Sequence, residues 1–78
     1  MNIAGNEYRL QVASDVQRDG LGLECYRVAG GDEELVLEVF RSDSERTYFY
    51  SQFVQDLPLE LIEHVVSIAR QKLGQFVP

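Results

Sequence analysis

The segment from residue 34 to residue 74 constrains the fold of this 78-residue chain more than any other feature. It holds two runs of strand-forming residues, at 35–40 and at 47–50 with an extension toward Val54, and turn-forming residues follow each run. A single amphipathic segment comes next and closes at Gly74. Strands followed by one helix favour an antiparallel sheet with the helix on one face, so the segment predicts an α+β fold.

Two earlier segments extend the predicted sheet. Tyr8, Leu10 and Val12 alternate with polar residues, which is the period of a strand with one buried face. Residues 14–20 have the composition of a loop, residues 21–29 alternate again, and Gly30-Gly31 suits a tight hairpin. We therefore expect an antiparallel β-meander of three to four strands followed by one C-terminal amphipathic helix (β-β-β-β-α). All of residues 1–78 form one domain in this interpretation, with 1–6 and 75–78 as frayed tails.

The helix is predicted over residues 58–73. Pro58 suits the first helical position, where its missing N–H costs nothing, and Gly74 suits a left-handed cap. Arg70 and Lys72 complement the negative end of the helix dipole. The apolar stripe that should face the sheet comprises Ile62, Val65, Val66, Ala69 and Leu73, with Leu61 and Ile68 beside it.

The loop after strand 35–40 decides which side chains the helix covers. A three-residue loop over 42–44 pairs Leu37 with Phe49 and Val39 with Thr47, whereas a loop one residue longer reverses the two faces. On the shorter loop, the face opposite the helix holds five large side chains and four charged ones: Tyr26, Val36, Phe40, Tyr48 and Tyr50, with Arg9, Glu24, Glu38 and Arg46.

That face has no cover in the predicted fold, because one helix can shield only one side of a four-stranded sheet. Aromatic side chains interspersed with arginine are typical of binding hot spots, although similar residues also occur on solvated sheet faces. We expect a protein-binding surface there, with another protein or a second copy of the chain as partner. Its residues are Tyr26, Val36, Phe40, Arg46, Tyr48 and Tyr50.

Charge and cysteine content narrow the class of partner. The net charge of −6 opposes binding to phosphate backbones and anionic lipid, so neither nucleic acid nor membrane is expected. The alternative is a single-stranded nucleic-acid binder that stacks bases on the aromatic strand 46–50.

The single Cys25 excludes an internal disulfide framework and favours a cytoplasmic setting. Neither a classical signal peptide nor a membrane-spanning run is expected.

Residues with catalytic or metal-binding chemistry are few. His64 has no second histidine or cysteine pair at ligand spacing, so no metal site is expected. Cys25 could act as a nucleophile only if His64 approached it, and its place in a strand favours a core position. The glycine pairs precede no helix and do not suit phosphate binding. We expect no catalytic residues, no cofactor and no small-molecule ligand, and hence a small, acidic, non-enzymatic adaptor, inhibitor, immunity factor or chaperone-like accessory protein.

The order of elements has one resemblance. Short strands, an aromatic strand, Leu57-Pro58-Leu59-Glu60 and a closing helix resemble the second half of small acidic bacterial secretion chaperones. Those proteins open with a helix and work as dimers. Residues 1–7 have neither the length nor the periodicity of such a helix, so the resemblance covers less than half of that pattern and implies a fold-level likeness.

Overall fold

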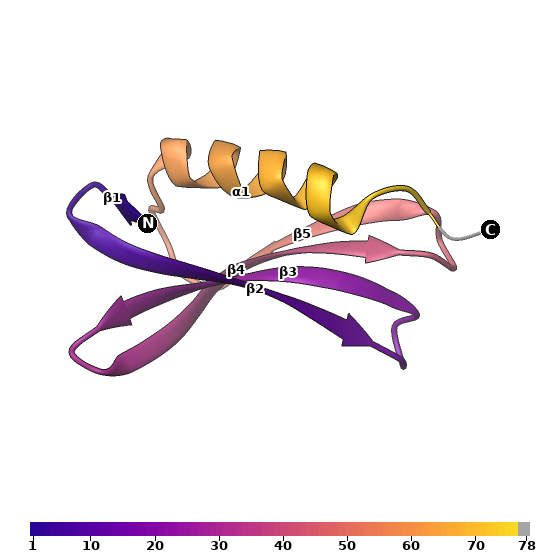
Figure 1. Ribbon diagram of the computed structural model, residues 1–78, viewed down its shortest axis with the longest axis horizontal. Coiled ribbons are helices and arrows are strands. Elements are labelled where there is room, and N and C mark those ends of the chain that lie inside the picture. Colours follow the sequence, from indigo (N-terminus) through magenta and orange to yellow (C-terminus); the bar gives the residue numbers. More distant parts are fainter. Residues whose placement is uncertain (77–78) are drawn as a thin grey trace.

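A computed structural model describes residues 1–76 and shows one antiparallel sheet with a helix on one face (Figure 1). The strands lie in the order β1-β2-β3-β4-β5, each beside its neighbour in sequence. This confirms the α+β meander and adds one strand to it. No helix in the described part of the chain is long and apolar enough to cross a membrane. The elements are β1 (Asn2–Ile3), β2 (Asn6–Asp15), β3 (Gly20–Ala29), β4 (Asp32–Ser42), β5 (Thr47–Gln52) and α1 (Leu59–Leu73).

The additional strand lies at the N-terminus, where a frayed tail was expected. A turn at Ala4-Gly5, with φ values of 52° and 79°, folds β1 back on β2. Ile3 is 8% exposed and belongs to the core cluster. The Met1 ammonium group donates a 3.0 Å hydrogen bond to the carbonyl of Tyr8. The first six residues are therefore part of the packed domain.

Two hairpin connections differ in how they use glycine. Gly30 and Gly31 have φ values of 59° and 88°, which confirms the predicted tight hairpin. The expected loop 14–20 is only a short turn, because β2 and β3 pair up to Asp15 and Gly20. A Cβ atom on Gly20 would lie 1.9 Å from the carbonyl oxygen of Arg41. Glycine is needed there because β4 approaches closely.

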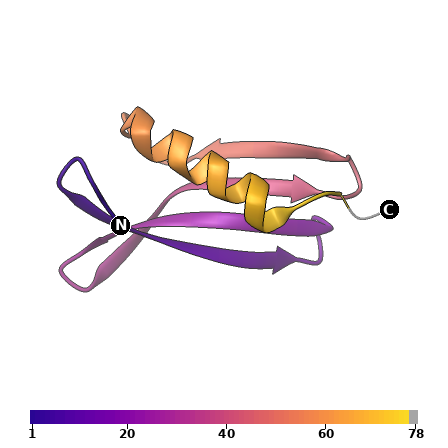
Figure 2. The same cartoon turned by 45° about the horizontal axis from the view of Figure 1, so that its top comes forward.

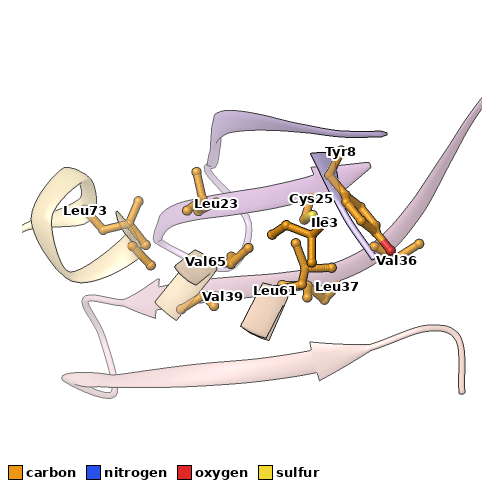
Figure 3. Packing of buried hydrophobic residues seen from close by; sticks show 11 residues of the cluster. Ile3, Tyr8, Leu23, Cys25, Val36, Leu37, Val39, Leu61, Val65 and Leu73 are labelled. Atoms are coloured by element: carbon orange, nitrogen blue, oxygen red, sulfur yellow. The ribbon is translucent and has the colours of Figure 1, made fainter. Parts of the chain in front are cut away.

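The core lies between α1 and the sheet, which is strongly twisted (Figures 1 and 2). The helix buries Leu61, Val65, Ala69 and Leu73, one residue per turn. Leu61 therefore takes the buried position that was predicted for Ile62, and Ile62 is only partly buried. The core side chains labelled in Figure 3 are Ile3, Tyr8, Leu23, Cys25, Val36, Leu37, Val39, Leu61, Val65 and Leu73.

A β-bulge in β4 places Val36 in this core. Cys25 pairs with Leu37 and Tyr26 pairs with Leu35, so Val36 is an extra residue on its strand. Val36 and Leu37 are both fully buried as a result. The prediction that Val36 lies on the uncovered face is therefore wrong, because strict alternation does not hold through a bulge.

Both ends of α1 are defined by backbone geometry. Pro58 precedes the helix with φ −57° and ψ 133°, and its carbonyl accepts a 3.0 Å hydrogen bond from the Leu61 amide. Pro58 is therefore the N-cap residue and not the first helical residue. The helix ends at Gly74 as predicted, but the expected left-handed cap is wrong, because Gly74 has φ 69° and ψ −154°, and this ψ lies outside the left-handed helical region.

Candidate functional site

The turn between β4 and β5 is one residue longer than the predicted loop. Ser42 pairs with Thr47, so the turn comprises residues 43–46, and Val39 pairs with Tyr50. The predicted pairs of Leu37 with Phe49 and of Val39 with Thr47 are wrong. The Ser42 hydroxyl accepts a 3.2 Å hydrogen bond from the Glu45 amide, which stabilises the longer turn. The faces of β5 are therefore reversed relative to the prediction.

Tyr48 lies on the helix side of the sheet as a consequence. Its hydroxyl donates a hydrogen bond to the Gly74 carbonyl. The guanidinium carbon of Arg70 lies 5.4 Å from the centroid of the Tyr48 ring, and the Phe76 ring centroid lies at the same distance of 5.4 Å. Arg46, also expected on the open face, lies in the turn with a φ of 53°. Tyr48 therefore fixes the end of α1 and does not form an open stacking platform with Tyr50.

The open face, which we define as the side of the sheet opposite α1, keeps Tyr26 and Phe40 as predicted. Phe40 is nevertheless only 2% exposed. The guanidinium carbon of Arg18 lies 3.8 Å from the Phe40 ring centroid, and Arg18 donates hydrogen bonds of 2.8 and 3.2 Å to Glu38. These bonds, together with those to Asp15, raise the pKa of Arg18.

Tyr26 is partnered in a similar way. Arg9 lies with its guanidinium carbon 4.6 Å from the Tyr26 ring centroid and forms a 2.6 Å ion pair with Glu33. The Tyr26 hydroxyl donates a 2.9 Å hydrogen bond to Glu24. The rings of Tyr26 and Phe40 are thus covered by the protein's own arginines, and this part of the open face carries a network of ion pairs. A protein-binding role for Tyr26 and Phe40 stays a prediction.

A different aromatic surface lies at the edge of the sheet. We define the aromatic edge as residues 47–53, which comprise β5 and the next residue and contain no charged side chain. Phe49, Tyr50 and Phe53 are 44%, 45% and 54% exposed. β5 is the outermost strand of the sheet (Figure 2). The sequence signal that could have found this surface is seven consecutive uncharged residues in a chain with 26% charged residues.

Backbone groups of the aromatic edge point away from the sheet. The Phe53 amide donates a 2.9 Å hydrogen bond to the Val36 carbonyl, which continues the register of β4 and β5. In an antiparallel pair, hydrogen-bonded residues alternate with residues whose N–H and C=O groups point outward. Tyr48, Tyr50 and Gln52 are the outward residues in this register. Within residues 1–76, no strand pairs with that side of β5.

A shallow hollow of about 210 Å³ adjoins the aromatic edge on its helix side. Its apolar lining includes core and edge side chains, and Arg70 supplies the charge. The hollow gives a strand added at β5 room for side chains against the end of α1. Its lining residues are Val39, Tyr48, Phe49, Tyr50, Val66 and Arg70.

Cys25 and His64, the nucleophile and base considered from sequence, differ in exposure to solvent. Cys25 is fully buried, and burial raises the pKa of its thiol to about 11. His64 is exposed on α1, so the two do not share a site open to solvent. No group of three or more His, Cys, Asp or Glu side chains suited to a metal ion is found among residues 1–76.

Comparisons of the chain with protein-family models, with curated proteins and with solved structures give no match.

Proposed function

We propose that this chain is a small, acidic, non-enzymatic protein-interaction module that binds its partner along the aromatic edge. The observation that supports this proposal most directly is an outermost strand with outward backbone groups and exposed aromatic side chains on both of its faces. An added strand gains main-chain hydrogen bonds from such an edge, and the side chains beside it supply specificity.

The aromatic edge is a better binding surface than the open face. Partner binding at the open face would have to displace Arg18 from Phe40 and Glu38, or Arg9 from Tyr26 and Glu33. Displacing a hydrogen-bonded arginine loses existing contacts before any new contact forms. Binding at β5 breaks no ion pair of the aromatic edge, because residues 47–53 carry no charged side chain and no strand pairs with the outward side of β5 within residues 1–76.

The proposed role is that of an adaptor, an inhibitor or immunity factor, or a chaperone-like accessory protein. A cytoplasmic setting is part of the proposal, because Cys25 is an unpaired thiol and a reducing compartment suits it. The net charge of −6 favours a neutral or basic partner over nucleic acid.

The test compares three purified baits in a lysate of the source cells: the unchanged chain, Tyr50→Lys and Val16→Lys. Val16 is 92% exposed in the turn between β2 and β3, so Val16→Lys adds the same charge away from the aromatic edge. We expect at least one protein to be retained by the unchanged chain and by Val16→Lys but lost with Tyr50→Lys. That protein must then bind the unchanged chain as a purified pair. Equal retention of every captured protein by all three baits would overturn the proposal.

A further inference from the structure

We propose that the strand which completes the sheet is β5 of a second copy of this chain, paired antiparallel about a two-fold axis at Tyr50. This inference rests on the proposed function and names its partner. It joins two five-stranded sheets edge to edge and leaves the open faces and α1 uncovered.

The distribution of charge permits self-pairing at this edge. A chain with net charge −6 repels its own copy on average, and this repulsion is weakest where acidic side chains are locally absent. The aromatic edge is such a place, because residues 47–53 carry none of the thirteen acidic side chains. Soluble proteins usually protect edge strands with charged residues, proline or bulges, and this edge has none of these.

The opposite edge of the sheet has such protection. β1 covers the start of β2, and Arg9 and Asp15 place one charge at each end of the part of β2 that β1 leaves uncovered. Arg9 is held by Glu33, and Asp15 is held by Arg18. Edge-to-edge pairing is therefore favoured at β5 and opposed at β2.

The sequence of the aromatic edge is self-complementary about Tyr50. In a two-fold pairing centred there, Tyr48 faces Gln52 of the second copy, Phe49 faces Ser51 and Thr47 faces Phe53. Each large ring thus meets a smaller side chain, and the two Tyr50 rings pair at the axis.

This register also provides hydrogen-bond partners for the outward backbone groups of β5. Tyr48, Tyr50 and Gln52 are the residues whose N–H and C=O groups point outward, and they are brought opposite one another. Each such pair exchanges two hydrogen bonds, as in the interior of any antiparallel sheet.

Sedimentation equilibrium tests the self-pairing with a charge exchange at the axis. We expect the unchanged chain to have about twice the 8.9 kDa chain mass at tens of micromolar concentration. Tyr50→Lys alone and Tyr50→Glu alone should each be monomeric, because like charges then face each other. An equimolar mixture of the two variants should recover the doubled mass, which also shows that both variants are folded.

Disulfide trapping tests the register. Residues opposite each other in a hydrogen-bonded antiparallel pair have Cα atoms about 5.5 Å apart, a separation that suits a disulfide. Tyr50→Cys should therefore form covalent dimers at least tenfold faster than Val16→Cys, whose exposed thiol reports random collision. Cys25 does not interfere because it is buried.

The two proposals can fail separately. A monomeric unchanged chain, or trapping at position 50 no faster than at position 16, overturns self-pairing. If the lysate baits then still show a protein that depends on Tyr50, the interaction module stands with a different partner. Faster trapping of Phe49→Cys than of Tyr50→Cys overturns the register centred on Tyr50.

Discussion

At the scale of single residues, Arg41 makes the contacts that hold the end of α1 against the sheet. Its side chain is 8% exposed and forms an ion pair with Asp43, with 2.9 Å between Nε and Oδ1. Its Nη2 atom donates a 3.1 Å hydrogen bond to the same carboxylate. Its Nη1 atom donates to the carbonyl of Leu73, which the helix end leaves without an intrahelical partner, and to the carbonyl of Gln75 just beyond α1.

Replacement of this arginine should cost more stability than its single charge suggests. Arg41→Gln removes a buried partner of Asp43 and leaves the helix-terminal carbonyl of Leu73 unsatisfied, so we expect a loss of about 3 kcal/mol in the free energy of unfolding. Lys72→Gln is the control, because it removes an exposed positive charge from the same helical turn and should cost less than about 0.5 kcal/mol. Urea denaturation measures the unfolding free energy of both variants. Equal losses would contradict the role of Arg41 in holding the end of α1 against the sheet.

Cys25 gives a pH dependence of stability. Burial raises the pKa of the folded-state thiol from 9.0 to about 11. The unfolded chain therefore releases this proton first as the pH rises, and the folded state loses stability between about pH 9 and pH 11. A shift of this size corresponds to roughly 2–3 kcal/mol.

The Cys25→Ala variant isolates this contribution, since other groups titrate alike in both proteins. We expect the difference in unfolding free energy between the two proteins to shrink as the pH rises through that range. A difference that stays constant would show that the Cys25 thiol ionises as easily in the folded state as in the unfolded chain.

At the scale of elements, the sequence predicts what depends on local patterns. The alternation in residues 21–29, the glycine hairpin at 30–31 and the helix with its stop at Gly74 are all confirmed. Such features follow from side-chain periodicity and from backbone preferences at glycine.

The features that a local pattern does not predict are a turn length and a bulge. Turn-forming residues occupy both the predicted loop 42–44 and the observed turn 43–46, yet the one-residue difference in length moves Tyr48 and Tyr50 together from the open face to the helix side. The bulge at Val36 likewise depends on how β4 packs against β3 and α1. Because of these two features, Val36, Tyr48 and Tyr50 lie on the helix side of the sheet and not on the open face.

The rotation of α1 can be tested in the same terms. Leu61 is fully buried whereas Leu59, in the same turn, is 69% exposed. Leu61→Ala should lower the free energy of unfolding by about 3 kcal/mol through lost burial and a cavity. Leu59→Ala should cost less than about 0.5 kcal/mol. Denaturant titrations measure both substitutions, and similar effects would mean that α1 turns a different face toward the sheet.

At the scale of the whole molecule, the small size of the domain and the uncovered edge act together. A chain of 78 residues buries a limited core, and α1 shields only one face of the sheet. The open face meets water through arginine–carboxylate networks, and the opposite edge is protected by charges. The aromatic edge has neither an ion-pair network nor protecting charges. It is therefore the part of the molecule where binding of a partner is most favourable.

Salt should strengthen the proposed self-pairing. Each copy carries a net charge of −6, while the paired residues 47–53 carry none, so the long-range force between copies is repulsive and the contact itself contains no ion pair. Raising the ionic strength from about 10 mM to about 150 mM shortens the Debye length from roughly 30 Å to roughly 8 Å and screens that repulsion. We expect the dimer dissociation constant from sedimentation equilibrium to fall severalfold over this range.

The Val16→Lys variant, which lowers the magnitude of the net charge away from the contact, should show a smaller fall in the dissociation constant. A dissociation constant that rises with salt would instead indicate ion pairs across the contact, and would place it on a charged surface and not on β5.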